Sequence, residues 1–180
     1  MNIYTVIPAR GGSKSIPLKN IKELNGRPLI DYSIKYSLAC SLINQTIVST
    51  DSSKIAEIAL NCGAEAPFLR PDNLAEDHTP DFPVILHALE SLEKLYGEQI
   101  DIIVLLRPTS PLRPSKLIEK GIQLMKDFPD ASSVRSIALS SEHPYRQWRL
   151  KDDYMIGYES KIDEAYNKPR QELPIVYFQT

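Results

Sequence analysis

A cationic, glycine-bearing loop near the amino end is the segment of this sequence best suited to chemistry. It spans residues 8–20 and places Gly11 and Gly12 shortly after a short apolar run. Two adjacent glycines let backbone amides approach phosphate oxygens without a Cβ in the way. Counter-charge comes from three cations in the same loop: Arg10, Lys14 and Lys19. We therefore predict an extended loop that wraps a polyphosphate, against the simpler alternative of a solvated basic turn.

The spacing within this loop excludes two common phosphate-binding motifs. No glycine stands five residues before Gly12, and Pro17 blocks the helix that must follow the lysine of a P-loop. The third glycine of G-x-G-x-x-G is missing, as is the ribose-binding acid expected about 20 residues later, which argues against a dinucleotide-dependent oxidoreductase. What remains is an open phosphate loop of the kind that nucleotidyltransferases use.

A second loop, residues 107–113, carries groups that suit an acidic sugar. Prolines stiffen it, and Thr109 and Ser110 offer hydroxyls in front of a helix amino end. Such an arrangement suits a carboxylate or sugar hydroxyls. The alternative is that Pro111 and Pro114 only start the following helix.

The elements that must position these loops alternate between strands and helices. Apolar or β-branched runs predict strands at residues 3–7, 45–50, 68–69, 101–106 and 132–139. Apolar residues at helical spacing predict helices over residues 28–38, 55–62, 84–95 and 115–126. Asp51 and Ser52 are expected to cap the second helix, and Gly97 to end the third. The pattern predicts an α/β fold, a doubly wound, mainly parallel sheet with helices on both faces.

In such a sheet, ligands bind outside the carboxyl ends of the strands. We therefore expect residues 8–20, Thr50, Asp51, Arg70 and residues 107–113 along one edge of the molecule. The charge distribution supports an anion site there. Residues 1–35 hold six cations and two anions, whereas the whole chain has a net charge of −2.

The composition is that of an ordinary globular domain. A length of 180 residues with 42% hydrophobic and 24% charged content excludes disordered and fibrous classes. The small negative charge argues against nucleic acid as a partner. Cys40 and Cys62 are too few for a disulfide scaffold or a zinc site. No apolar stretch of about 18 residues and no signal peptide are found, so we expect a cytoplasmic protein with no membrane partner.

The character of the sequence changes after residue 139. Residues 1–139 are predicted to form the nucleotide-binding core, whereas residues 140–172 mix aromatic side chains with arginines, a composition typical of interfaces. We interpret residues 140–172 as an excursion for dimerisation and substrate contact, and residues 173–180 as a strand that returns to the core. Because this apolar run ends the chain at Thr180, we expect a sequence that is cut short.

Six short motifs, taken in order, cover essentially the whole chain. They are residues 9–14, 17–20, 48–51, 69–71, 108–113 and 169–174. Together they resemble the motifs of the CMP-N-acylneuraminate (CMP-sialic acid) synthetases and their nonulosonate-activating relatives, whose fold is that of the nucleotide-diphospho-sugar transferases. The resemblance implies a cytidylyltransferase that joins CTP to a 2-keto-3-deoxy sugar acid and releases pyrophosphate, with Mg²⁺. The C2 hydroxyl of the sugar acid is then expected to attack the α-phosphorus in line with the leaving pyrophosphate.

The resemblance also assigns nucleotide-binding residues. They are Arg10, Gly11, Gly12, Ser13, Lys14, Lys19, Asn20 and Arg70. Arg10, Ser13 and Lys14 are expected on the triphosphate, Lys19 and Asn20 along the α-phosphate and ribose, and Arg70 near the cytidine. Arg10, Lys14 and Lys19 are the expected catalytic residues, because catalysis here consists mostly of positioning and charge neutralisation.

The sugar acid is expected on residues from two parts of the chain: Arg107, Thr109, Ser110, Arg170 and Gln171. The resemblance implies that Arg170 and Gln171 reach the sugar-acid pocket of the partner copy across a homodimer interface. Arg107 departs from the sialic acid enzymes, which usually carry glutamine there, and it either takes the substrate carboxylate through two hydrogen bonds or indicates a different sugar. Ser15 stands where glycine is commoner.

The resemblance places the Mg²⁺ ligands in a segment after the final motif, as an Asp-x-Asp pair. No residue of this chain is therefore assigned as a metal ligand, and the chain itself is expected to be weakly active or inactive. Two alternatives stay open, a CMP-Kdo synthetase and a non-catalytic sugar-nucleotide-binding module. The first is disfavoured because residues 108–111 stand where those enzymes carry an acidic pattern. The expected partners are CTP, a nonulosonic acid and a second copy of the chain.

Overall fold

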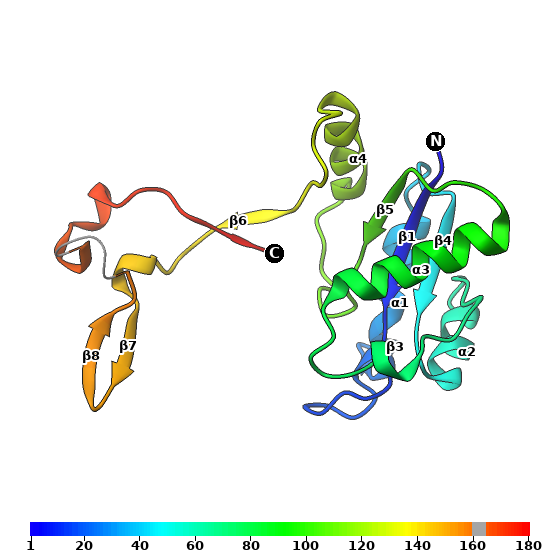
Figure 1. The fold of residues 1–180 in the computed structure, drawn as a ribbon, viewed down its shortest axis with the longest axis horizontal. Helices are drawn as coiled ribbons and strands as arrows, with labels where there is room; N and C mark the ends of the chain where they lie inside the picture. The colour runs from blue at the N-terminus through cyan, green and yellow to red at the C-terminus, as the bar shows by residue number, and fades with distance from the viewer. Residues whose placement is uncertain (160–164) are drawn as a thin grey trace. The chain divides into compact units, whose positions relative to one another are not determined.

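Three parallel strands form the sheet on which the rest of the first part of the chain is built. The computed structural model describes residues 1–159 and 165–180, which fall into two units, Met1–Gln123 and Leu124–Thr180. In the first unit, β1 (Ile3–Pro8) lies between β4 (Gln45–Ser49) and β5 (Ile102–Leu105), as Figure 1 shows. Val6 of β1 stands opposite Ile47 on one side and Leu105 on the other. Residues Ile3–Ile7 are all buried, as expected for a strand covered on both faces.

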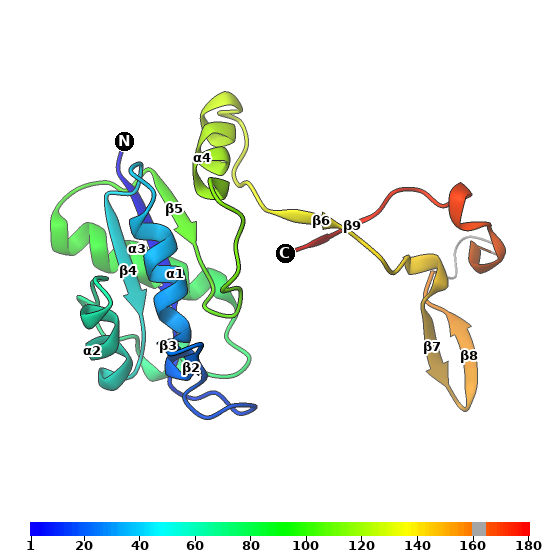
Figure 2. The same cartoon turned by 180° about the vertical axis from the view of Figure 1, so that it is seen from behind.

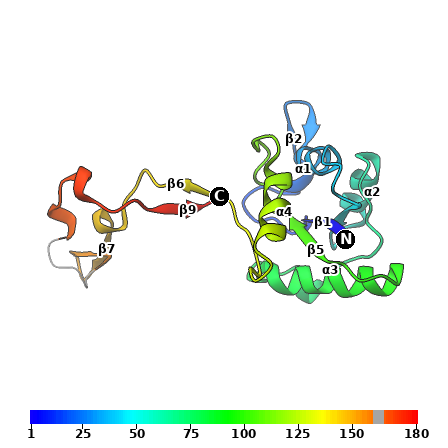
Figure 3. The same ribbon diagram turned by 90° about the horizontal axis from the view of Figure 1, so that it is seen from above.

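Helices cover both faces of this sheet. On one face, α1 (Leu29–Leu38), α2 (Ser53–Asn61) and the first residues of α4 (Leu117–Asp127) contribute Ile34, Ala59 and Ile122 to one buried cluster with residues of β1 and β4. On the other face, α3 (Asp81–Tyr96) places Leu92 against Tyr4. The opposite views in Figures 1 and 2, and the view from above in Figure 3, show α3 and the α1–α2 pair on the two sides. The predicted fold class is confirmed.

The strand order explains where a ligand can bind. The chain leaves β1, crosses through α1 and returns as β4; it then crosses back over β1 to reach β5. Right-handed crossovers in opposite directions require opposite faces, so α1 and α3 lie on different sides. The loops after β1 and β5 both lie at the carboxyl ends of the strands, where parallel sheets of this kind bind ligands.

The predicted helix ends are mostly confirmed. Ser52 caps α2 by accepting the N–H of Ile55 at 3.5 Å, and Gly97 ends α3 with a left-handed φ of 70°. The short strand predicted at residues 68–69 is wrong. This region forms isolated parallel bridges, from Glu65 to Ile47 of β4 and from Leu69 to Thr50 just after β4. A strand ladder does not form because Pro67 and Pro71 cannot donate to it.

A small hairpin before α1 was not predicted. It pairs β2 (Glu23–Leu24) with β3 (Arg27–Pro28) through Asn25 and Gly26, both at positive φ. The Asn-Gly dipeptide was its sequence signal. Short 3-10 helices complete the described elements: η1 (Lys19–Ile21), η2 (Asp72–Leu74), η3 (Pro144–Arg146), η4 (Ala165–Asn167) and η5 (Arg170–Glu172).

The second unit contains two antiparallel strand pairs. β6 (Ile137–Leu139) pairs with β9 (Tyr177–Gln179), and β7 (Trp148–Lys151) pairs with β8 (Tyr154–Gly157). The units divide after Gln123, whereas the core was expected to extend to residue 139. Within the second unit, β6 and β9 form a two-stranded sheet, and the return of residues 173–180 to the core stays a prediction. A short apolar run predicts a strand, but not the strand with which it pairs.

Candidate functional site

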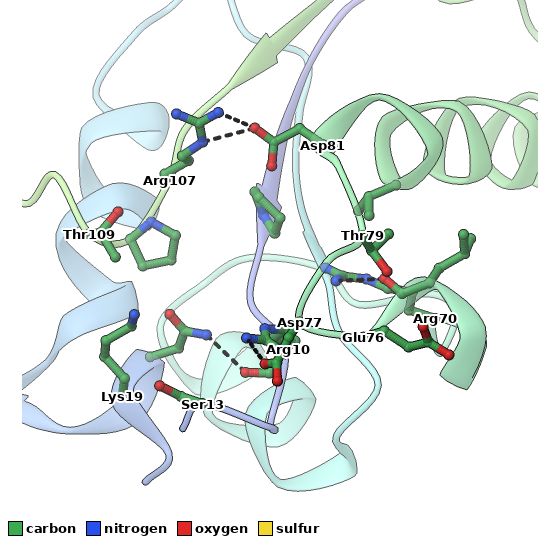
Figure 4. A pocket seen from close by; sticks show the side chains of 15 residues that line it. Arg10, Ser13, Lys19, Arg70, Glu76, Asp77, Thr79, Asp81, Arg107 and Thr109 are labelled. Carbon is green, nitrogen blue, oxygen red and sulfur yellow. Dashed lines mark hydrogen bonds and ion pairs between the residues drawn. The ribbon is translucent and has the colours of Figure 1, made fainter. Parts of the chain in front are cut away.

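A cleft of about 300 Å³ opens at the carboxyl ends of β1 and β5, within the first unit. Seven of the predicted site residues line it: Arg10, Ser13, Lys19, Asn20, Arg70, Arg107 and Thr109. Figure 4 shows them around the hollow, together with three carboxylates from the segment before and at the start of α3, namely Glu76, Asp77 and Asp81. The cleft thus joins cations from three loops with an acidic segment that the sequence analysis did not single out.

The loop after β1 is held by contacts to the end of β4. Ala9 donates its N–H to the carbonyl of Ser49 at 2.9 Å, and Gly11 donates its N–H to Oδ1 of Asp51 at 2.8 Å. A Cβ on Gly11 would lie 3.2 Å from the Cβ of Ser52, so this position needs glycine for close approach. The amide of Gly11 is engaged by Asp51 and is not directed to a ligand, whereas a Cβ on Gly12 meets nothing within 4 Å.

Asp51 therefore has a different role from the expected one. The helix cap is Ser52 alone, while the Asp51 carboxylate fixes the loop that carries Gly11. No local sequence pattern predicts this contact, because it joins the ends of two strands that become neighbours only in the sheet.

Two of the predicted triphosphate cations converge on one carboxylate. Arg10 places Nη2 2.6 Å from Oδ1 of Asp77 and donates Nη1 to the carbonyl of Ala75 at 3.2 Å. Lys14 forms an ion pair with the other oxygen of Asp77. Hydrogen bonds from Lys14 and then from Arg10 hold the pKa of Asp77 below its ordinary value. Two cations that share one anion are placed to share a phosphate oxygen as well.

Asn20 and Lys19 lie on the other side of the same loop. Asn20 is buried and donates Nδ2 to the backbone carbonyl of Arg10 at 2.9 Å, so it fixes the loop. Lys19 is half-buried, and no ion pair engages it within the part of the chain that the structure describes. Among the described residues, its ammonium therefore lines the cleft without a carboxylate partner and can pair with an anionic ligand.

Arg70 is a buried cation that ties the cleft wall together. It donates Nε to Oγ of Ser49 at 3.2 Å, Nη2 to the carbonyl of Ser49 at 2.5 Å and Nη1 to the carbonyl of Leu74 at 3.5 Å. Its exposed fraction is 5%, and burial holds the pKa of its guanidinium below the ordinary value. These contacts join the end of β4 to η2, so Arg70 shapes the wall of the cleft.

Arg107 bridges the mouth of the cleft to α3. It donates Nε to Oδ2 of Asp81 at 2.9 Å, and its Nη2 also pairs with this oxygen. Thr109 lines the cleft, whereas Ser110 is exposed and is not part of the lining; its N–H bonds the carbonyl of Arg107 at 3.2 Å. Of the three residues predicted in this loop, the structure thus brings Arg107 and Thr109 to the cleft and leaves Ser110 outside its lining.

Arg113 holds this second loop in place, a role that the sequence analysis missed. It donates Nη2 to the carbonyl of Arg107 at 2.5 Å and Nη1 to Oγ of Ser33 at 2.9 Å. Its guanidinium also lies over the ring of Tyr36, 5.7 Å from the centroid. The only available signal was its place at the end of the 108–113 motif.

Arg170 and Gln171 lie in the second unit, in η5, and both are exposed. Arg170 borders a hollow of about 200 Å³ together with Ser141, Glu142, His143, Arg146 and Leu173. Within residues 1–159 and 165–180, no group of three or more His, Cys, Asp or Glu side chains is placed to hold a metal ion. In the same ranges, no helix has both the length and the apolar character needed to cross a membrane.

The known proteins to which this chain is similar are described as cytidylyltransferases or CMP-sugar synthases. The family model described as cytidylyltransferase matches residues 4–160. The chain is 33% identical to the pseudaminic acid cytidylyltransferase of Campylobacter jejuni subsp. jejuni, over 96% of this chain and 72% of that protein. It is 38% identical to a CMP-N,N'-diacetyllegionaminic acid synthase of Legionella pneumophila, over 70% of this chain and 54% of that protein. It is 36% identical to the N-acylneuraminate cytidylyltransferase of Escherichia coli, over 97% of this chain and 40% of that protein.

Solved structures agree on the fold. A CMP:2-keto-3-deoxy-manno-octonic acid synthetase in complex with CTP superposes with a TM-score of 0.72 at 19% identity, over 100% of this chain and 72% of the other. A cytidylyltransferase from Leptospira borgpetersenii gives a TM-score of 0.55 at 21% identity, over 81% and 56%. At these identities the likeness supports the nucleotidyltransferase fold and nothing finer.

Proposed function

The chain belongs to the cytidylyltransferase family, and from that premise we propose that it transfers a cytidylyl group from CTP to a nonulosonic acid. The relatives named above act on pseudaminic, legionaminic and N-acylneuraminic acids. What these acids share is the nonulosonic acid class, so the proposal names that class and no single acid. The products are a CMP-sugar and pyrophosphate.

One observation carries the proposal. Cations from the loop after β1 and from the loop after β5 meet around one cleft at the carboxyl edge of the sheet. The first loop brings Arg10 and Lys19, and the second brings Arg107 with the hydroxyl of Thr109. A triphosphate and a sugar acid are both anions, so a reaction that joins them needs two cationic surfaces facing one hollow.

The chemical step follows from this arrangement. The C2 hydroxyl of the acid attacks the α-phosphorus and loses its proton; an O–P bond forms, and the bond from the α-phosphorus to the pyrophosphate oxygen breaks. We assign Arg10 and Lys14 to the outer phosphates, which requires both cations to exchange Asp77 for phosphate oxygens. We assign Lys19 to the α-phosphate, where its ammonium offsets the charge that develops in the transition state. Asn20 and Asp51 keep the loop in position through Arg10 and Gly11.

A magnesium ion enters this proposal through the resemblance alone. The described residues do not present a carboxylate cluster for it, so no step above depends on it. When bound, such an ion supplies additional charge neutralisation at the phosphates. The assignment of Arg170 and Gln171 to the sugar acid rests on the same resemblance.

We also propose that the second unit associates with a second copy of the chain. The β7–β8 hairpin exposes large apolar side chains: Trp148, Leu150, Tyr154, Met155 and Ile156. An exposed apolar surface of this kind is typical of an interface between proteins. Size-exclusion chromatography with light scattering tests this, and a monomeric mass at micromolar concentration would contradict it.

The reaction is proposed for the cytoplasm, where CTP is made.

The decisive experiment is pyrophosphate release from CTP with a panel of acids. The panel contains N-acetylneuraminic, N,N'-diacetyllegionaminic and pseudaminic acids, and 2-keto-3-deoxy-manno-octonic acid serves as the competing acceptor. Release with one or more of the first three, and none without an acid, supports the proposal. Release only with 2-keto-3-deoxy-manno-octonic acid would favour a CMP-Kdo synthetase, and CTP binding without release would favour a binding module.

A further inference from the structure

The ion pair with Asp81 engages Arg107, a cleft cation that is expected to receive the carboxylate of the sugar acid. Arg107 follows β5 directly, and Asp81 is the first residue of α3, so the pair spans the mouth of the cleft. Figure 4 shows the two side chains facing each other, with Thr109 near Arg107. The acid substrate carries the same chemical group as Asp81, and both therefore suit the same guanidinium.

The geometry of this pair favours exchange. Nε and Nη2 of Arg107 both meet Oδ2 of Asp81, whereas the strongest arginine–carboxylate pairs use both carboxylate oxygens. Within the described residues, Oδ1 of Asp81 accepts no hydrogen bond and Nη1 of Arg107 donates none. The Arg107 side chain is 51% exposed and that of Asp81 35% exposed, and ion pairs with this exposure are weak.

Asp81 is also placed to remain charged after it loses Arg107. It lies in the first turn of α3, a helix of 16 residues, where the helix dipole favours a negative side chain. Water reaches the carboxylate as well, so release of Arg107 leaves no buried, unpaired charge. The backbone of Arg107 stays fixed meanwhile, because Arg113 binds its carbonyl.

We propose that Asp81 is a positioning residue, which holds Arg107 in the empty cleft and is replaced on Arg107 by the carboxylate of the sugar acid. A neutral sugar offers no group to take the place of Asp81, so Arg107 remains paired and the acceptor gains nothing from it. Selection for acidic acceptors therefore comes from Arg107, and Asp81 lowers the free energy that the acid gains on binding to it. This inference rests on the proposed function, since it concerns the acceptor of the same reaction.

The test measures KM for the acid and for CTP by pyrophosphate release. Asp81→Asn removes the internal competitor and is expected to lower KM for the acid about 2- to 5-fold, the range set by a weak exposed pair. Arg107→Gln removes the receiving guanidinium and is expected to raise KM for the acid about 10-fold or more. In both variants KM for CTP stays within about twofold. Asp81→Asn added to Arg107→Gln is expected to change nothing further, because the effect of Asp81 passes through Arg107.

Two controls separate exchange from simpler effects. Glu76→Gln removes a carboxylate that lines the same cleft but does not pair with Arg107, so it reports the general effect of charge, and we expect KM for the acid within about twofold. The C1 carboxamide of the acid lacks the exchanging group, and Asp81→Asn is expected to leave its kcat/KM unchanged.

The outcomes are distinguishable. A higher KM for the acid in Asp81→Asn, or the same decrease in the Arg107→Gln background, overturns the exchange while the proposed function stands. If calorimetry and pyrophosphate release show that the unchanged chain neither binds nor converts any acid of the panel, the exchange and the proposed function are both wrong.

Discussion

Replacement of Arg10 by alanine should remove most of the stabilisation that CTP gives to the protein. Arg10 holds Asp77 at 2.6 Å and the carbonyl of Ala75 at 3.2 Å, and its side chain is 30% exposed. It is thus a largely desolvated cation on the cleft wall. Lys14, the second cation assigned to the outer phosphates, pairs with the same carboxylate but is 83% exposed, so the two variants compare a desolvated cation with an exposed one.

The expected magnitudes follow from these exposures. At a CTP concentration of 100 times Kd, binding stabilises the folded protein by about 2.7 kcal/mol, which raises Tm by roughly 5–11 °C for a chain of this size. Loss of charge-assisted hydrogen bonds from Arg10 costs roughly 1.5–3 kcal/mol of CTP binding. A loss near the upper end leaves about 0.4 kcal/mol of stabilisation, or a shift of roughly 1–2 °C. Loss of the exposed Lys14 charge costs about 1 kcal/mol or less and leaves most of the shift.

The assay is a thermal melt with and without CTP for the unchanged chain, Arg10→Ala, Lys14→Ala and Arg10→Ala combined with Asp77→Asn. The combined variant matters because Arg10→Ala alone leaves Asp77 facing the phosphates as a repelling charge. The combined variant is therefore expected to recover part of the increase in Tm that CTP gives. A full CTP shift in Arg10→Ala, or a larger loss in Lys14→Ala than in Arg10→Ala, would refute the assignment of Arg10 to the triphosphate.

Three further predictions concern the same loop and its partners. Lys19→Ala should lower kcat about 10²- to 10³-fold with a smaller effect on KM for CTP, because Lys19 is assigned to the α-phosphate; steady-state kinetics test this, and an unchanged kcat would contradict it. Gly11→Ala should lower the free energy of unfolding by about 1 kcal/mol or more in urea, since its Cβ would lie 3.2 Å from Ser52, whereas Gly12→Ala should be neutral; equal effects would argue against the close approach. Asp77 has a depressed pKa in the folded chain, so its contribution to stability is present above the ordinary aspartate pKa and is lost as the pH falls through the folded value. Asp77→Asn should therefore reduce the difference in Tm between pH 6 and pH 2.5, and an unchanged difference would show that Asp77 does not contribute.

Local sequence patterns were sufficient to predict most helices and strands of the first unit. The buried run of β1, the helical spacing in α1 and α3, and the cap at Ser52 depend on residues close together in the chain, and each was predicted. The parallel sheet followed from their alternation. The ligand-binding loops of a parallel sheet lie at one edge, so the position of Arg10 and Arg107 around one cleft could also be predicted.

The fold class and the cations of the site could thus be predicted, since both follow from short-range patterns of apolar, glycine and charged residues. Which carboxylates contact those loops depends on the tertiary structure. Asp77 on Arg10 and Lys14, Asp81 on Arg107, and Asp51 on Gly11 are contacts between segments far apart in the chain. Likewise, β6 pairs with β9, a strand far from it in the chain. An ion pair or a short strand pair depends on the position of both partners in space, and a local pattern describes only one of them.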